Sequence, residues 1–352
     1  MKVLHTADLH LKGYEDERWR TLRKLIQIGD EEGIDLFAIS GDLFDGGVDA
    51  QDLRPHIREV FSGNRFKIVL IPGNHDGDSF QDAYFGEDVI VLTDLRQCFE
   101  YGDVRIWGMP FERIGGPDIL DKLRSLAERL SAGKSNVILY HGELLDAFFS
   151  RRDFGDEGDA RYMPMRLSYF KDLNVDYVLA GHFHSRFDVR RLEGGGYFIY
   201  PGSPISITRT ETGQRRINLF EIGRPPTEYP LDTPHFEEVL VELDPLRDKD
   251  PTEVVRKGLR SVHPQARIIL RVTGYINSEE ADISEIQLAK TLREITGGRA
   301  VEEHLEFRDV RTILEDELFK SFVDKLESTD YEEERRRHMR NIAMRAMARA
   351  RL

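Results

Sequence analysis

Cysteine is nearly absent from this chain of 352 residues, in which Cys98 is the only one. A disulfide bond within the chain is therefore excluded, and so is a metal cluster built on cysteine thiolates. A bound metal ion has to take its ligands from aspartate, asparagine and histidine, whose oxygen and nitrogen atoms suit the harder divalent ions.

Long hydrophobic runs and an excess of positive charge are also missing. No stretch reaches the roughly 18 apolar residues of a membrane-spanning helix. The N-terminal MKVLHTADLH is interrupted by His5 and Asp8, unlike the hydrophobic segment of a secretory signal, so we expect a cytoplasmic protein with no membrane partner. The 50 Lys and Arg against 64 Asp and Glu give a formal charge of −14, which argues against a uniformly basic nucleic-acid binder but allows local phosphate-binding patches.

Short apolar runs that predict strands alternate with helical patterns, as in KVLHT before a helix over 16–32 and DLFAIS before one over 49–61. This alternation is typical of a layered α/β sandwich. Clustered Pro and Gly at 223–234 indicate a linker. We therefore expect a first domain at 1–223 and a smaller α/β domain at 234–311.

Residues 312–352 are expected to form two C-terminal helices, because hydrophobic residues recur there at helical spacing. The apolar stripe of the second helix consists of Met339, Ile342, Ala343, Ala346, Met347 and Ala350. Seven arginines and no acidic residue lie in 335–352, directly after an acidic stretch. Three interpretations stay open: a helix packed on its own body, a basic arm on DNA phosphates, and a docking helix for a partner protein.

Residues that are able to bind metal ions follow five of the predicted strands. They are Asp8 and His10, Asp42, Asn74 with its neighbours His75 and Asp76, His141, and His182 with His184. Because ligand sites in open α/β sheets collect at the carboxyl ends of strands, we expect these side chains to converge. Each residue alone has an ordinary explanation, such as a helix cap, a tight turn or a buried core histidine. Five strand ends that all carry such residues by chance would be a rare event.

Seven of these residues can serve as ligands, namely Asp8, His10, Asp42, Asn74, His141, His182 and His184. Seven ligands are too many for one transition-metal ion and suit two ions if one carboxylate is shared. Asp42 is the natural shared ligand, and Gly41 and Gly73 allow the backbone to turn sharply beside it. The sequence thus predicts a two-metal centre.

These residues stand in short motifs, which are DLH at 8–10, GD at 41–42, GNHD at 73–76, HG at 141–142 and GHFH at 181–184. The motifs and their order resemble those of the calcineurin-like metallophosphoesterases. Within that superfamily the chain is similar to the SbcD and YhaO branch, which includes the meiotic-recombination-eleven type of DNA double-strand-break repair nuclease. The similarity to this branch rests on HTADLHL, GDLFD and YPGSPISITRTETG, the last at 200–213.

The resemblance covers residues 1–222 and implies an α/β fold with a four-layer α/β/β/α sandwich. For the rest of the chain it implies a small DNA-binding α/β capping domain and C-terminal helices that dock on an SbcC-like coiled-coil ATPase. A homodimer is implied as well. Ile57, Val60 and Phe61 could form a dimer contact, although packing in the core is the more ordinary role for such residues.

The resemblance also implies a role for each site residue. It places one ion on Asp8, His10, Asp42 and His184, and the other on Asp42, Asn74, His141 and His182. Two Mn²⁺ ions are favoured, with Mg²⁺ or other divalent ions as alternatives. His75 would stabilise the charge that develops on the phosphate or protonate the leaving oxygen, and Asp76 would orient His75. Asp45, the third catalytic candidate, stands where many members carry a second histidine, which leaves the balance between end resection and internal cleavage open.

The function expected from the sequence is a Mn²⁺-dependent DNA exonuclease or endonuclease that works with an SbcC-like ATPase in DNA end processing at the nucleoid. A phosphatase, a cyclic-nucleotide phosphodiesterase and an inert scaffold subunit stay open as alternatives. The phosphoprotein phosphatases usually read GDYVDRG and GNHE, which this chain does not. A scaffold with a relic site is the weaker alternative because every ligand position is filled.

Overall fold

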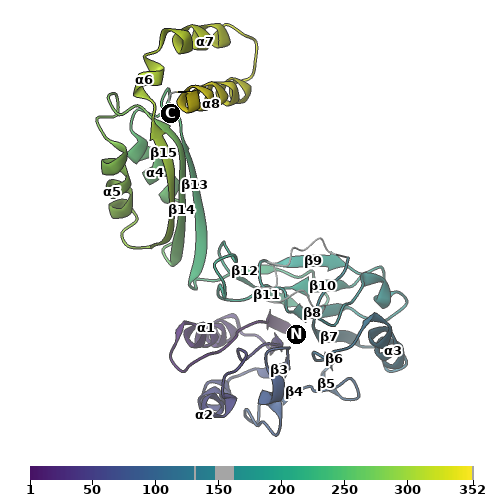
Figure 1. Cartoon of the computed structure of the whole chain (residues 1–352). Helices are drawn as coiled ribbons and strands as arrows, with labels where there is room; N and C mark the ends of the chain where they lie inside the picture. Colours follow the sequence, from purple (N-terminus) through teal and green to yellow (C-terminus); the bar gives the residue numbers. More distant parts are fainter. Residues whose placement is uncertain (131, 147–161, 351–352) are drawn as a thin grey trace. The chain divides into compact units, whose positions relative to one another are not determined.

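The structure, a computed structural model, describes residues 1–130, 132–146 and 162–350. The chain divides into two compact units, Met1–Phe236 and Glu237–Leu352 (Figure 1). Each unit has a sheet and a hydrophobic core of its own.

Two six-stranded sheets form the first unit. One has the strand order β12 (Glu228–Pro230), β11 (Arg216–Glu221), β1 (Lys2–Thr6), β2 (Leu36–Ser40), β3 (Lys67–Ile71) and β4 (Val89–Val91). The other has the order β5 (Cys98–Tyr101), β6 (Val104–Met109), β7 (Ser135–His141), β8 (Tyr177–Gly181), β10 (Tyr197–Tyr200) and β9 (Asp188–Arg191). The central neighbours β1 to β4 and β6 to β8 pair in parallel, so their carboxyl ends lie along the same edge of each sheet.

Alternate side chains of each central strand belong to different layers. On β2, Phe37 and Ile39 join the core that contains the helices next to the first sheet, whereas Leu36 and Ala38 pack between the two sheets. Leu139 on β7 belongs to the same inter-sheet layer. Because both faces of these strands are buried, they read as nearly continuous apolar runs.

Helices cover the outer faces of the two sheets. The first sheet carries α1 (Glu17–Glu32) and α2 (Ala50–Phe61), and the second carries α3 (Gly116–Ala127). The α1 helix begins after Asp16, whose side chain caps the first turn, and ends at Gly33, which adopts the left-handed conformation that closes many helices. The four-layer α/β/β/α sandwich that the sequence predicts is confirmed.

The helix face that was considered for a dimer contact lies inside the protein. Ile57 and Phe61 are completely buried in the core below α2, and Val60 packs against that core. These side chains therefore stabilise the fold of the first unit and are not offered to a second copy of the chain.

The second unit contains a three-stranded sheet with the order β13 (His235–Leu243), β14 (Ala266–Ile276) and β15 (Ala300–Asp309). The helices α4 (Pro251–Leu259) and α5 (Glu285–Ile295) pack on it through Val255, Leu288 and Leu292. Part of the linker expected at 223–234 forms β12 at the edge of the first sheet. The boundary between the two units, Phe236 to Glu237, lies near the start of β13.

Three helices end the described part of the second unit: α6 (Arg311–Leu314), α7 (Glu317–Glu327) and α8 (Glu333–Ala350). Met344 on α8 is completely buried against Val310, Ile313 and Phe319, so α8 packs on its own unit. The expected apolar stripe is partly wrong, because Ile342 is 54% exposed. The side chain of Ala350 and residues 351–352 lie outside the described part.

Within the described ranges, none of the helices combines the length and the hydrophobicity that a membrane crossing requires.

Two apolar residues of α8, one buried and one exposed, give a matched test of its packing. Met344→Ala should lower the free energy of unfolding of the second unit by about 2–5 kcal/mol, because a buried side chain leaves a cavity. Ile342→Ala should change it by less than about 0.5 kcal/mol, because the side chain is largely in solvent. Urea unfolding followed by circular dichroism measures both. Equal losses from the two variants would contradict the packing of α8 through Met344.

Candidate metal centre

The candidate site lies where strands of both sheets end. His141 is the last residue of β7 and His182 directly follows β8, whereas Asp8 and Asp42 lie two residues beyond β1 and β2. Asp42 Oδ2 is 3.3 Å from His141 Nε2, although the two residues belong to different sheets. The convergence that was expected from the strand ends is therefore present.

Unusual backbone conformations are concentrated in the loops of the site. Asp8, His10, Asp42 and His182 have positive φ angles of 57°, 48°, 51° and 89°. Such conformations cost on the order of 1–3 kcal/mol per residue and persist where the surrounding structure holds them. Here the amide of Asp8 donates to the carbonyl of Gly41 at 3.1 Å, and the amide of His10 donates to that of Asp42 at 2.9 Å.

Two glycines allow the close approach of groups at the site. A Cβ atom on Gly73 would stand 2.2 Å from Asp42 Oδ1, and one on Gly181 would stand 2.0 Å from the carbonyl oxygen of Ser40. Cβ atoms essentially never come within 3.0 Å of another heavy atom. A side chain at position 73 would displace the Asp42 carboxylate, and one at position 181 would push β8 away from β2. The GNHD and GHFH motifs therefore need their glycines for steric reasons.

The first group of predicted ligands consists of Asp8, His10, Asp42 and His184. All four are buried, and each offers one ligand atom within 4.8 Å of the other three. The Nε2 atoms of His10 and His184 face one another at 3.3 Å. Asp42 Oδ2 lies 3.7 Å from His10 Nε2, and Asp8 Oδ1 lies 3.7 Å from His184 Nε2.

The second group consists of Asn74, His141 and His182, and Asp42 Oδ2 lies 3.3 Å from His141 Nε2. Asn74 Oδ1 lies 2.8 Å from His141 Nε2 and 3.1 Å from His182 Nδ1. Because His141 Nδ1 donates to the carbonyl of Ser40 at 2.8 Å, its Nε2 atom is directed at Asn74 and Asp42. The Asp42 carboxylate therefore lies close to histidine nitrogens of both groups.

Burial and the neighbouring histidines shift the pKa values of Asp8 and Asp42. Burial raises the pKa of Asp8 above its ordinary value. Burial acts in the same direction on Asp42, but the charge of His141, whose Nε2 atom lies 3.3 Å from Oδ2, outweighs it and holds the pKa of Asp42 well below the usual range. In return, the pKa of His141 is raised to about 9, because the Asp42 charge outweighs the effect of burial.

A divalent cation fits this set of donor atoms. Among the residues that the structure describes, the fully buried Asp42 Oδ2 receives no hydrogen bond, and an unsatisfied buried group costs about 1–3 kcal/mol or more if it is charged. The Nδ1 atoms of His10 and His184 lie beside carboxylates that accept hydrogen bonds from them, which leaves the two Nε2 atoms, 3.3 Å apart, as the ring atoms that can bind a metal ion. A cation beside these atoms would bind both imidazoles and give Asp42 Oδ2 a partner.

Asp45 contacts a predicted ligand. Its Oδ1 atom lies 3.1 Å from His10 Nδ1, and its Oδ2 atom lies 2.8 Å from Lys12 Nζ and 3.2 Å from Arg18 Nη1. Partial burial favours the protonated form, but the hydrogen bonds from His10 and Lys12 and the charge of Arg18 hold the pKa of Asp45 well below its ordinary value. Asp45 is thus an ionised group that holds His10 and has no proton to donate.

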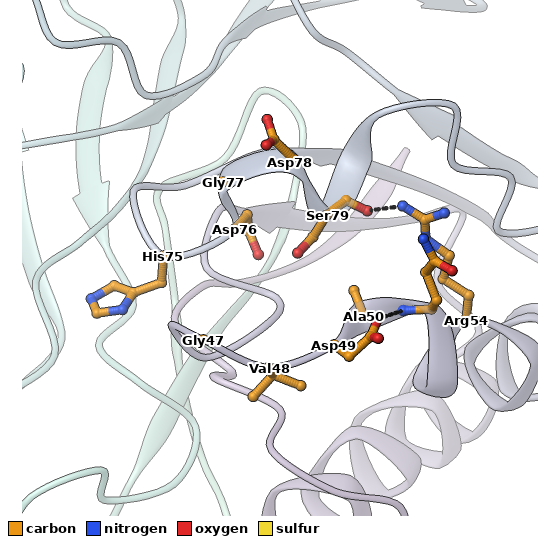
Figure 2. A pocket seen from close by; sticks show the side chains of 11 residues that line it. Gly47, Val48, Asp49, Ala50, Arg54, His75, Asp76, Gly77, Asp78 and Ser79 are labelled. Carbon is orange, nitrogen blue, oxygen red and sulfur yellow. Dashed lines mark hydrogen bonds between the residues drawn. The ribbon is translucent and has the colours of Figure 1, made fainter.

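His75 lies half-buried beside the first group, with its ring centre 4.7 Å from that of His10. It also lines a pocket of about 320 Å³ between the start of α2 and the turn η1 (Gly77–Phe80), shown in Figure 2. Arg54 closes one wall of this pocket by donating to the carbonyl of Ser79 at 2.6 Å. The predicted general acid therefore stands between the ligand groups and an open polar pocket.

Asp76 is held by backbone amides, and its expected role in orienting His75 stays a prediction. Its carboxylate accepts hydrogen bonds from the backbone amides of Phe44 at 2.8 Å and Gly73 at 2.6 Å, and it points away from the His75 ring in Figure 2. Burial, and then the charge of Asp42, raises the pKa of Asp76 to about 7. Asp76 therefore supports the GNHD loop. Asp45 offers a ligand atom within 4.8 Å of one on His75.

Glu211 was missed as a site residue. It is completely buried, and its carboxylate lies 3.2 Å from His184 Nδ1 while it accepts the backbone amide of Ile207 at 2.7 Å. Arg215 donates from the same side to the carbonyl groups of His184 and Ser203. Burial opposes ionisation, but the hydrogen bond and charge of His184 lower the pKa of Glu211 to about 2. The acidic residue in TRTETG, a segment already linked to the family, was the available signal.

Comparison with known families gives one match. The family model described as Calcineurin-like phosphoesterase matches residues 1–186, which is more than half of the 352 residues. The matched range contains all seven predicted ligands and His75. A search of the curated proteins finds no match.

Several solved structures are similar to parts of the chain. TT1561 of Thermus thermophilus is 14% identical with a TM-score of 0.41, over 61% of this chain and 92% of that one. A dimetal phosphatase from Danio rerio is 12% identical with a TM-score of 0.41, over 62% and 91%. The NAD nucleotidase of Haemophilus influenzae is 11% identical with a TM-score of 0.38, over 85% and 60%. None of their activities is carried over to this chain.

The shared position of Asp42 leads to a test of the metal centre. We expect the protein to bind two divalent ions per chain, and Asp42→Ala to weaken the binding of Mn²⁺ by at least about 100-fold, because both groups lose their common carboxylate. Titration calorimetry with Mn²⁺ measures the number of ions and their affinities. Asp121→Ala, which removes a carboxylate with a 75% exposed side chain on α3, is the matched control. One ion or none on the unaltered protein would contradict the two-metal site.

Proposed function

The chain belongs to the calcineurin-like phosphoesterase family, and we propose that within this family it is a Mn²⁺-dependent DNA nuclease that hydrolyses phosphodiester bonds. The observation that carries the proposal is the pair of ligand groups that meet at the buried, partly unsatisfied Asp42 carboxylate, with His75 beside them. The choice of DNA rests on the similarity to the SbcD and YhaO branch and on the branch-specific segment 200–213, which contains Glu211.

We assign the side chains of this site different roles in hydrolysis. Two divalent ions, when bound, would neutralise the phosphate and lower the pKa of a bound water so that hydroxide is available. Asp42 would hold both ions, since it borders both groups. His75 would donate a proton to the leaving oxygen or stabilise negative charge on the phosphate. Lys12, whose side chain is 58% exposed beside Asp45, adds a positive charge for the DNA backbone.

The second unit supports a polymeric substrate and a partner. A small phosphomonoester needs no additional unit with its own core, such as residues 237–352. We assign this unit to DNA binding and its helices α7 and α8 to an SbcC-like coiled-coil ATPase. Although α8 packs on its own unit through Met344, Leu318 on α7 is 73% exposed and Ile342 on α8 is 54% exposed, which leaves apolar side chains for a partner helix. A homodimer, if formed, uses a surface other than the face of α2.

The proposal is tested by the choice of substrate. With Mn²⁺, we expect turnover of bis-p-nitrophenyl phosphate to exceed that of p-nitrophenyl phosphate, and cleavage of linear duplex and single-stranded DNA, faster with the ATPase partner present. Gel assays on end-labelled and circular DNA separate exonuclease from endonuclease activity. Turnover of the monoester alone would indicate a phosphatase, and no turnover of any substrate by metal-loaded protein would indicate a scaffold. Either result would contradict the nuclease assignment.

His75 gives a second test, because it lies beside the ligand groups without belonging to them. His75→Ala should retain both ions and lose about 10²–10⁴-fold in the turnover of a diester, the usual contribution of general acid catalysis. Metal content and the rate on bis-p-nitrophenyl phosphate are measured on the same sample. His56→Ala, on α2 in the same unit, serves as a histidine control. If metal content fell together with the rate, His75 would be a ligand and the assignment of a proton donor would be wrong.

A further inference from the structure

A buried carboxylate joins a predicted metal ligand to the loop 203–213. Glu211 is completely buried, and its Oε1 atom lies 3.2 Å from His184 Nδ1 while it accepts the amide and the hydroxyl of Thr208, both at 3.2 Å. Its Oε2 atom accepts the amide of Ile207 at 2.7 Å. Four donors from two separate segments of the chain therefore converge on this one side chain.

The same loop also contacts the segment that leads into the second unit. Ser206 donates its hydroxyl to the carbonyl of Glu211 at 2.7 Å and accepts the amide of Phe236 at 3.4 Å. The amide of Gly213 donates to the carbonyl of Phe236 at 2.7 Å. Phe236 is the last residue of the first unit and lies on β13, which continues into the second unit. A series of hydrogen bonds thus runs from His184 through Glu211 to the start of β13.

A cation at His184 would strengthen the first link of this series. The Nε2 atom of His184 is the one that faces the other ligands, 3.3 Å from His10 Nε2. A cation bound to Nε2 keeps the ring hydrogen on Nδ1, where it is donated to Glu211, and its charge makes that hydrogen bond stronger. Without a cation, the hydrogen can also sit on Nε2, which leaves two acceptors, Nδ1 and the carboxylate, facing one another.

From these contacts we infer that Glu211 is a positioning residue that transmits metal binding at His184 to the loop 203–213 and to Phe236. With Mn²⁺ bound, the loop is held in the conformation of the structure, and without the ion it opens more often. The order of the segment that leads into the second unit is thereby linked to the state of the metal centre. The inference rests on the metal centre of the proposed function but not on the choice of DNA as substrate.

The backbone of His184 is held independently of the Glu211 side chain. The guanidinium of Arg215, which is nearly completely buried, donates to the carbonyl of His184 and to that of Ser203, the latter at 3.0 Å. Arg209, in the middle of the loop, is exposed. Loss of the Glu211 charge should therefore loosen the loop while the backbone of the metal ligand stays in place.

The experiment measures hydrogen–deuterium exchange of the full chain with and without Mn²⁺, by mass spectrometry with fragmentation that resolves single amides. Titration calorimetry first gives the dissociation constant. With Mn²⁺ at about 100 times this constant, exchange at the amides of Ile207, Thr208 and Phe236 should slow by about 10–100-fold, because the opened loop lacks the contact that the ion strengthens. Trypsin cleavage after Arg209 should slow in parallel.

Glu211→Gln breaks the link at its centre. Glutamine has one side-chain oxygen in place of two, so in either orientation its NH₂ group faces a donor, which is the His184 ring or the amide of Ile207. With Mn²⁺ raised to the same multiple of the dissociation constant of this variant, the ion should slow exchange at Ile207 and Thr208 by less than about twofold. Thr212→Ala, an exposed position in the same loop, is the control that should behave as the unaltered protein.

Ser206→Ala breaks the link further along. The effect of Mn²⁺ on Ile207 and Thr208 should remain, whereas the effect on Phe236 should disappear, because the hydroxyl that accepts its amide is removed. Ser206 is only partly buried and the change is small, so this variant decides if Glu211→Gln does not fold.

The outcomes separate the inference from the proposed function. Equal exchange with and without Mn²⁺ in a protein that binds the ion, or an undiminished effect of Mn²⁺ in Glu211→Gln, would overturn the inference. An unchanged effect on Phe236 in Ser206→Ala would overturn it as well. A protein that binds no Mn²⁺ would refute the inference together with the metal centre. Mn²⁺-dependent protection that is lost in Glu211→Gln, in a protein that cleaves no phosphodiester, would uphold the inference and refute the nuclease assignment.

Discussion

The burial of the Asp42 carboxylate is the constraint on which the rest of the site depends. One of its oxygens accepts the amide of His75 at 2.8 Å, and among the described residues the other has no donor although it is completely buried. The glycine at position 73 leaves room for this carboxylate, and the positive φ of Asp42 directs it toward both sheets. A cation between the two ligand groups would give this oxygen a partner at the centre of the site.

The layers and the ligand set could be predicted because their signals are local. Strands that are buried on both faces read as apolar runs, helices show their own periodicity, and Asp8, Asp42 and His182 lie within two residues of strand ends. The hydrogen bonds that Asp76 accepts could not be predicted, because one of the donors is Phe44 from another loop. The contact of Glu211 with His184 joins residues 27 positions apart, and only the fold brings them together.

The buried face of the C-terminal helix α8 could not be predicted from the sequence either. Helical periodicity correctly predicts a helix there, but the face that is buried depends on what the neighbouring helices present. Met344 meets Phe319 of α7, whereas Ile342, part of the expected stripe, remains exposed. Arg340 is also nearly buried, because Glu327 and Glu333 accept its guanidinium hydrogen bonds at 2.6 and 2.8 Å. A pattern of hydrophobic residues does not reveal such ion pairs, one of which joins α8 to α7.

The most direct test of the metal centre is anomalous diffraction at the manganese edge from crystals of the full chain grown with Mn²⁺. The account predicts two anomalous peaks on either side of the Asp42 carboxylate. One should lie among Asp8, His10 and His184, and the other among Asn74, His141 and His182. Peaks remote from Asp42, or fewer than two peaks, would contradict it.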